Sequence, residues 1–126
     1  GKNENKFTLI NFLNNKIKKE EKFEIWSNAK RNVIDIEDVV PLVINLMENK
    51  NLTNAIINIA NPKSYFVNEI VRNFEKLSNK KANYNLVNKG QKDWYLNTEK
   101  VLEISKKIKV NFNENYLYKI LKKYYF

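Results

Sequence analysis

Apolar residues recur at two periods along this chain, and these periods predict an alternation of helices and strands. Residues 7–17 carry apolar side chains at the spacing of one face of an amphipathic helix: Phe7, Ile10, Leu13 and Ile17. Residues 23–26 alternate apolar and polar side chains, which is typical of a short strand. Residues 27–30 (Ser-Asn-Ala-Lys) then favour a turn.

The middle of the chain predicts two more strands around a helix. Residues 33–36 form a second short apolar segment, and Glu37 and Asp38 follow where a helix N-terminus favours negative charge. The helix is expected to end near Asn49, with Pro41 tolerated in its first turn. Residues 55–60 are almost wholly apolar, which indicates a strand buried on both faces. Such a strand needs neighbours, and this chain offers few.

The second half of the chain predicts a turn at residues 61–63 and a helix with Ser64 as its N-cap. Residues 84–87 predict a further strand. A helix capped by Thr98 or Asn97 is expected next, and a last helix after residues 113–114. The whole pattern predicts an α/β fold of about four short strands and five helices, in a single small domain over residues 1–126.

Composition excludes several classes of protein. The chain contains no cysteine and no histidine, which excludes disulfides, thiol nucleophiles and zinc sites built on these residues. Catalysis by this chain alone would need carboxylates, Tyr or Lys. No apolar run has membrane-spanning length, and the first residues lack a signal-peptide pattern. We therefore expect a cytoplasmic protein that does not bind a membrane.

The net charge of +9 has two explanations. One is a surface for nucleic acid or phosphate, and the other is a coding bias that also enriches Asn and Ile. The basic residues occur as separate pairs rather than as one block, which favours the second explanation. A module for RNA or single-stranded DNA stays as the alternative function, because four aromatic residues lie near lysines and could stack on bases: Tyr65, Tyr84, Trp94 and Tyr95.

Several segments, taken in order, resemble the C-terminal part of extended short-chain dehydrogenases, the family of NAD-dependent nucleotide-sugar epimerases and dehydratases. The segments are Arg31 with residues 33–36 and Asp38-Val39, then residues 58–61, Ser64 with Glu69-Ile70, and residues 97–100. The resemblance covers nearly the whole chain. It implies the substrate-binding portion of such an enzyme, with a UDP-, dTDP-, CDP- or GDP-sugar as partner.

The resemblance also implies roles for particular residues. Arg31 would bind the diphosphate of the nucleotide sugar, and Lys89 or Lys92 lies near the expected place of a second phosphate-binding arginine. The strand that borders the nucleotide base would be Phe23, Glu24, Ile25 and Trp26. Two alternatives stay open from the residues alone. Arg31 could form a surface ion pair with Asp35, with Glu37 or with a missing domain, and the apolar side chains of residues 23–26 could be core or interface.

The dinucleotide-binding half of such an enzyme is absent from this chain. Its Gly-x-x-Gly-x-x-Gly turn cannot be built from Gly1 and Gly90, the two glycines present. The resemblance therefore implies that NAD(P) belongs to a missing N-terminal domain, and that this chain has no catalytic, cofactor-binding or metal-binding residue and is inactive alone. Tyr118-x-x-x-Lys122 matches the family's catalytic spacing, but we interpret it as part of a packing helix. A scaffold without catalysis and a homodimer both stay open.

Overall fold

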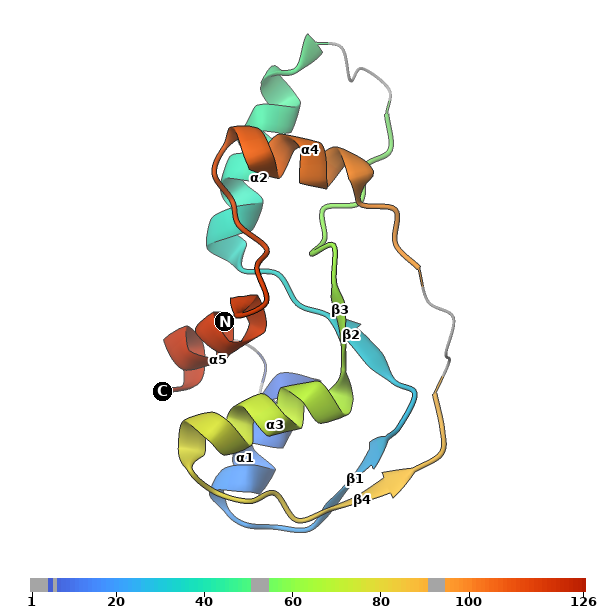
Figure 1. Cartoon of the computed structure of the whole chain (residues 1–126), viewed down its shortest axis with the longest axis vertical. Coiled ribbons are helices and arrows are strands. Elements are labelled where there is room, and N and C mark those ends of the chain that lie inside the picture. The colour runs from blue at the N-terminus through green and yellow to red at the C-terminus, as the bar shows by residue number, and fades with distance from the viewer. Residues whose placement is uncertain (1–4, 6, 51–54, 91–94) are drawn as a thin grey trace.

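The computed structural model describes residues 5, 7–50, 55–90 and 95–126. These residues form five helices and four short strands (Figure 1), which confirms the predicted α/β fold class. The elements in chain order are α1 (Leu9–Lys18), β1 (Phe23–Trp26), β2 (Lys30–Asn32), α2 (Ile36–Glu48), β3 (Ser64–Phe66), α3 (Val67–Ser78), β4 (Tyr84–Val87), α4 (Glu99–Lys107) and α5 (Tyr116–Tyr125). None of the helices described is both long and apolar enough to cross a bilayer.

The four strands pair as two small sheets. Strands β1 and β4 run parallel, with Phe23 opposite Tyr84 and Trp26 opposite Val87. Strands β2 and β3 are antiparallel, with Arg31 opposite Tyr65. The β1–β4 sheet lies with α1 and α3 toward one end of an elongated molecule, whereas α2 and α4 lie at the other end (Figure 1).

The larger hydrophobic core joins α1, α3 and α5 to the inner face of β1. The alternation along β1 buries Phe23 and Ile25, while Glu24 and Trp26 are exposed. The helices fill this core with the apolar stripes that their sequences predict. The fully or almost fully buried side chains include Leu13, Ile17, Ile70, Val71, Phe74, Leu117 and Leu121.

A second and smaller core lies between α2 and α4. Its buried members are Leu42 from α2 and Val101 and Ile104 from α4. Ile57 and Ile59, from the segment between α2 and β3, are partly buried and pack against these three side chains. The described residues therefore form two separate cores, and of these two the larger one contains paired strands.

A polar group, which we call the Asp35 cluster, connects the N-terminus of α2 to α5. Lys123 donates to Asp35 Oδ2 at 2.8 Å and also pairs with Glu37 at 2.6 Å. The hydroxyl of Tyr124 donates to Asp35 Oδ1 at 2.6 Å. The hydroxyl of Tyr116 accepts the backbone N–H of Asp35 at 3.0 Å and donates to the Asp38 carboxylate. The cluster therefore links a helix of the smaller core to a helix of the larger one.

The predicted strand at residues 33–36 is wrong. Strand β2 lies earlier, at Lys30–Asn32, and α2 already begins at Ile36. The reason is local, because the side chain of Asp35 accepts the backbone N–H of Glu37 at 3.1 Å and caps the helix. Ser64 is likewise not an N-cap. It lies in β3, and the α3 N-terminus is closed by the Glu69 carboxylate, which accepts the N–H of Phe66 at 2.7 Å.

The predicted buried strand at residues 55–60 is also wrong, since this segment has no regular structure here. Ile57 and Ile59 are partly buried, but Ile56 is 99% exposed. Among the residues described, no strand pairs with this segment, so its backbone lacks the ladder that would define it as a strand. The predicted turn at residues 61–63 is confirmed, and it is closed by the Asn61 side chain, which accepts the N–H of Lys63 at 2.9 Å.

Candidate functional site

A hollow of about 170 Å³ opens beside the edge of β1, and it brings together several residues singled out from the sequence. Glu24, Ile25, Trp26 and Arg31 all line it. The rest of the lining comes from Leu9, Ala29 and Val67. Phe23 lies apart from it in the larger core, where its ring contacts those of Phe12 and Tyr84.

A tight turn between β1 and β2 places Arg31 next to Trp26. The N–H of Ala29 donates to the carbonyl of Trp26 at 3.2 Å, so the chain reverses within three residues. The carbonyl of Ala29 then accepts the N–H of Val67 at 3.0 Å, which fixes the turn to the start of α3. Because β2 pairs with β3, the backbone of Arg31 belongs to a paired strand and not to a loose loop.

The guanidinium of Arg31 is exposed at this hollow. Its Nη1 donates to the carbonyl of Lys30 at 2.7 Å. Among the described residues, no carboxylate forms a salt bridge with Arg31, and both Asp35 and Glu37 pair with Lys123. The structure thus does not contain the surface ion pair of Arg31 with Asp35 or Glu37 that the sequence left open. The neighbouring Lys30 lies over the ring of Phe66, with Nζ 4.6 Å from the ring centroid.

Of the two lysines proposed as a second phosphate ligand, Lys89 lies among the described residues. Lys89 is exposed and follows β4, and its carbonyl accepts the N–H of Asn28 at 3.0 Å. Lys89 is thereby attached to the same turn that precedes Arg31. Lys92 lies outside the described residues. The structure brings Lys89 to the turn, and the phosphate-binding role of either lysine stays a prediction.

Two asparagines that the sequence analysis did not select hold this region together. Asn88 Oδ1 accepts the side-chain amide of Asn28 at 3.1 Å and the Ser27 hydroxyl at 3.5 Å. These contacts join residues about 60 positions apart, which the β1–β4 pairing brings side by side. The sequence signal was an Asn in the predicted turn at residues 27–30 and another directly after the predicted strand at residues 84–87, but no local pattern predicts that the two meet.

Gly90 is required by the close approach of two backbones beside the site. Its φ is +102°, and a Cβ there would lie 2.7 Å from the nitrogen of Ala29 and 2.9 Å from the carbonyl carbon of Asn28. Gly90→Ala should therefore lower the free energy of unfolding by about 2 kcal/mol, because both the backbone angle and the space are unfavourable. Urea denaturation measures this, with Lys89→Ala as the neighbouring control, for which we expect a change below about 0.5 kcal/mol.

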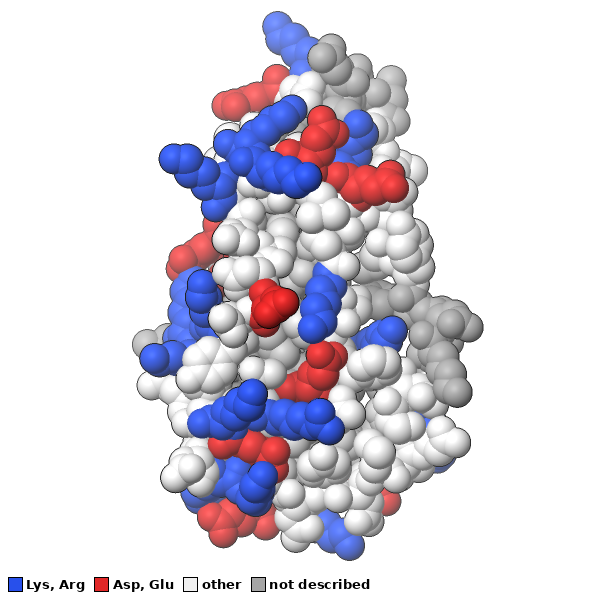
Figure 2. All heavy atoms as spheres, in the orientation of Figure 1, with Lys and Arg blue, Asp and Glu red and all other residues white. Residues whose placement is uncertain are grey.

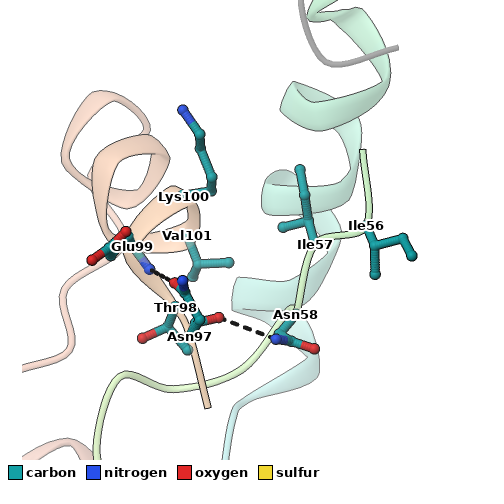
Figure 3. A pocket seen from close by; sticks show the side chains of 8 residues that line it. All are labelled: Ile56, Ile57, Asn58, Asn97, Thr98, Glu99, Lys100 and Val101. Atoms are coloured by element: carbon teal, nitrogen blue, oxygen red, sulfur yellow. Dashed lines mark hydrogen bonds between the residues drawn. The ribbon is translucent and has the colours of Figure 1, made fainter. Parts of the chain in front are cut away.

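A second hollow, of about 250 Å³, lies between residues 56–58 and the start of α4 (Figure 3). The carbonyl of Asn97 accepts the side-chain amide of Asn58 at 3.2 Å. Asn97 Oδ1 accepts the N–H of Glu99 at 3.1 Å, and Thr98 is buried. The Asn97–Lys100 segment thus uses these polar groups to begin α4 and to hold the chain at Asn58.

Titratable groups with shifted pKa values gather at the Asp35 cluster rather than at either hollow. Burial alone would raise the pKa of Asp35, but hydrogen bonds from Lys123, Tyr124 and the Glu37 N–H outweigh it and hold this pKa below its usual value. Burial raises the pKa of Tyr116, and the Asp38 carboxylate raises it further. The hydrogen bonds to Asp35 and Glu37 raise the pKa of Lys123. These groups serve as hydrogen-bond and ion-pair partners for one another, so we assign the cluster a structural role.

Neither a metal centre nor a tyrosine–lysine catalytic pair is indicated. Within the described part of the chain, no group of three acidic side chains is placed to hold a metal ion. Tyr118 and Lys122 lie in α5, whose Leu117, Ile120 and Leu121 are buried. This agrees with the interpretation of α5 as a packing helix, and it is Tyr116 that hydrogen-bonds across to α2.

The fold is that of one part of a Rossmann-type epimerase, as two solved structures show. Both are of UDP-glucuronic acid 4-epimerase from Bacillus cereus. The complex with UDP-glucuronic acid and NAD matches 99% of this chain and 40% of its own, with a TM-score of 0.73 and 18% identity. The complex with NAD matches 70% of this chain and 30% of its own, with a TM-score of 0.59 and 21% identity.

The chain thus spans about 40% of the length of the epimerase that it matches over 99% of its own residues. No protein-family model matches the sequence. No curated protein matches it either. The similarity is therefore one of fold, at a sequence identity of about a fifth.

Proposed function

We propose that this chain is the nucleotide-sugar-binding, C-terminal portion of an NAD-dependent epimerase or dehydratase of the extended short-chain dehydrogenase family. Residues 1–126 form its substrate-binding unit, and the dinucleotide-binding domain lies outside this chain. The chain alone is then inactive. One observation carries the proposal: Arg31, which forms no salt bridge with a carboxylate of the described residues, lines the same hollow as Trp26. The shared fold with an epimerase bound to UDP-glucuronic acid and NAD supports it.

The chemistry of the hollow suits a nucleoside diphosphate. A planar guanidinium can bind two phosphate oxygens at once, and Arg31 presents it from a paired strand. The indole of Trp26 is 51% exposed, which leaves a face for the base or the ribose. Glu24 and Ile25 also line the hollow. Lys89, whose carbonyl accepts the N–H of Asn28, adds a positive charge next to the turn at residues 27–29.

NAD does not fit this chain. The pyrophosphate of a dinucleotide is held where a glycine-rich turn opens a helix, and Gly90 is instead packed against the backbone of Ala29. In the intact enzyme NAD would supply hydride transfer to and from the sugar. The residues of this chain would bind and orient the nucleotide sugar, and none of them is assigned to the transfer of a proton or a hydride.

Arg31→Ala should weaken the binding of UDP to this chain about 10- to 100-fold, because the contact of the guanidinium with two phosphates is lost. Isothermal titration calorimetry with UDP, and with dTDP, CDP and GDP in parallel, measures the affinity. Arg72→Ala is the matched control, since Arg72 is an exposed arginine on α3. Equal affinity of the Arg31→Ala variant and the unsubstituted chain would overturn the proposed site.

The alternative of an RNA or single-stranded DNA module is less well supported. Tyr65 is buried and Tyr84 packs on Phe23, so neither ring is open to a base. Tyr95 is exposed, and Trp94 lies outside the described residues. On the face in Figure 2, Lys and Arg form several separate groups with acidic and uncharged residues between them. Steep loss of oligonucleotide binding with rising salt, together with no UDP binding, would favour this alternative.

A further inference from the structure

Helices α1 and α3 end on the same side of the molecule, and basic side chains gather there. The two ends meet through Lys80, whose Nζ donates to the carbonyl of Lys18 at 3.2 Å and to Glu20 Oε1 at 2.7 Å. In Figure 1 the chain runs from both helix ends along one edge of the molecule to β1 and β4. Two basic pairs that lie far apart in the sequence, residues 18–19 and 80–81, thereby become neighbours.

This region, which we call the basic end, consists of residues 16–22 and 72–82. It contains eight basic and three acidic residues, so it carries a net charge of +5 out of +9 for the whole chain. More than half of the excess charge is therefore concentrated at one end of the fold, although the basic residues are spread along the sequence. Such a concentration is the electrostatic signature of a surface that attracts polyanions.

The carboxylates of the basic end already have partners. Glu20 and Glu21 each pair with a lysine of the same region, at 2.7 and 2.6 Å. The carboxylate of Glu75 accepts the backbone N–H of Ala82 at 2.9 Å. Six basic residues of this region form no salt bridge with a described carboxylate: Lys18, Lys19, Lys22, Arg72, Lys76 and Lys81.

A hollow of about 570 Å³ lies within the basic end, at the end of α3. It is lined by Arg72, Glu75, Lys76, Asn79, Lys80 and Lys81. None of these six side chains is aromatic or aliphatic. The helix dipole favours cations in the last turn of α3, which accounts for Lys76, but Arg72 lies one turn earlier and Lys81 lies beyond the helix. The hollow thus has more positive charge than the helix end alone explains.

We propose that the basic end binds the phosphate backbone of a nucleic-acid strand. Binding to phosphates needs positive charge and no apolar anchor, whereas a protein partner is usually held by buried aromatic or aliphatic side chains. The lining of the hollow offers charge alone. Because no aromatic ring is present in that lining for a base to stack on, the binding is independent of nucleotide sequence.

This site is separate from the nucleotide-sugar hollow. Val67, the first residue of α3, lines the hollow of Arg31, whereas the last turn of α3 lines the basic one. Twelve helical residues, about 18 Å, lie between the two ends of α3. The chain can therefore bind a nucleic acid and a nucleotide sugar at once, which distinguishes this proposal from the alternative function as an RNA module with stacking tyrosines.

Fluorescence anisotropy of the whole chain with a labelled oligo(dT) of about 20 nucleotides, over a series of salt concentrations, tests the proposal. The affinity should fall steeply with rising salt, because each bound phosphate releases counterions. The double variant Lys76→Ala, Lys81→Ala should bind about tenfold more weakly at about 0.1 M salt. Its slope of log affinity against log salt should be smaller by about 1.5–2. Its melting temperature should stay unchanged, since both lysines are exposed.

The double variant Lys106→Ala, Lys107→Ala is the matched control, because it removes the same charge from exposed positions on α4 at the other end of the molecule (Figure 1). It should leave the oligonucleotide affinity almost unchanged. Three results overturn the proposal: no oligo(dT) binding at about 0.1 M salt, equal losses for the two double variants, or equally tight binding of a poly-glutamate peptide of the same charge, which would indicate an acidic protein as the partner.

UDP titration of the same variants keeps this proposal apart from the proposed function. A single diphosphate contacts only a small part of the basic end, so UDP affinity should depend on Arg31 and stay unchanged in the Lys76→Ala, Lys81→Ala variant. Arg31→Ala should in turn keep the affinity for oligo(dT). Loss of oligonucleotide binding in Arg31→Ala would mean that the two ligands share one site, which would overturn the separate site at the basic end.

Discussion

Replacing Asp35 with alanine should lower the free energy of unfolding by about 3 kcal/mol, one of the two largest losses that we expect from a single change in this chain. Two effects combine. The variant loses the N-cap of α2, a contact that is typically worth about 1 kcal/mol. It also removes the acceptor of the Lys123 and Tyr124 side chains, and hydrogen bonds to a charged group contribute about 1.5–3 kcal/mol. Guanidinium chloride denaturation at pH 7 measures the sum.

Asp35→Asn separates the charge of this residue from its hydrogen bonds. The amide oxygen can still cap α2 and accept from Tyr124, so the loss should be less than half of that for Asp35→Ala. Because the pKa of Asp35 is lowered in the folded state, its charge stabilises the fold above the usual pKa of an aspartate, and this stabilisation is lost as pH falls through the lowered value. The difference between the original chain and Asp35→Asn should therefore shrink below about pH 4. A constant difference down to pH 2 would contradict the assigned role of the charge.

Phe74→Ala should cost about 3–5 kcal/mol, which is the usual range for removing a buried phenylalanine ring. Phe74 is among the largest fully buried side chains of the larger core. Its ring meets that of Tyr125 edge-on, with 5.5 Å between the centroids, so the change also removes a contact between α3 and α5. Thermal unfolding followed by circular dichroism measures the loss.

Two further variants keep this prediction measurable. Phe74→Leu retains most of the volume, and we expect it to cost well under half as much and to stay folded even if the alanine variant does not. Phe7→Ala removes a ring that is exposed, so its effect should stay below about 0.5 kcal/mol. Equal losses for Phe7→Ala and Phe74→Ala would mean that the larger core is not where we place it.

The local sequence pattern predicts those elements whose structure is decided by their own residues. The strands at residues 23–26 and 84–87 were predicted with the bounds that β1 and β4 have. The pattern failed at residues 33–36, because the cap formed by Asp35 outweighs the strand preference of Val33 and Ile34. It failed at residues 55–60 for a different reason. The apolar run predicted burial on both faces, but Ile57 and Ile59 are only partly buried and no described strand pairs with the segment, and a strand is defined by its neighbours.

Only part of the candidate site could be predicted from the sequence. The resemblance selected Trp26 and Arg31, and the structure places both at one hollow. Their roles toward a nucleotide sugar stay predictions. The contacts that position these two residues could not be predicted from the sequence. Asn88 and Gly90 reach the turn at residues 27–29 only because β1 pairs in parallel with β4. Pairing between distant segments leaves no local trace in the sequence.

The parallel pairing of β1 with β4 also affects how this chain folds. About 60 residues separate Phe23 from Tyr84, so the sheet forms only after a long loop has closed, and non-local contacts of this kind slow folding. A ribosome adds about 5–20 residues per second, so β1 waits several seconds for its partner strand during synthesis. At the start of that interval the α3 side chains that later share a core with Phe23 and Ile25 have not yet been made, and β1 lacks its partner strand until the end of it. The nascent chain is therefore exposed to aggregation, and to chaperones that bind apolar segments, until β4 has left the ribosome.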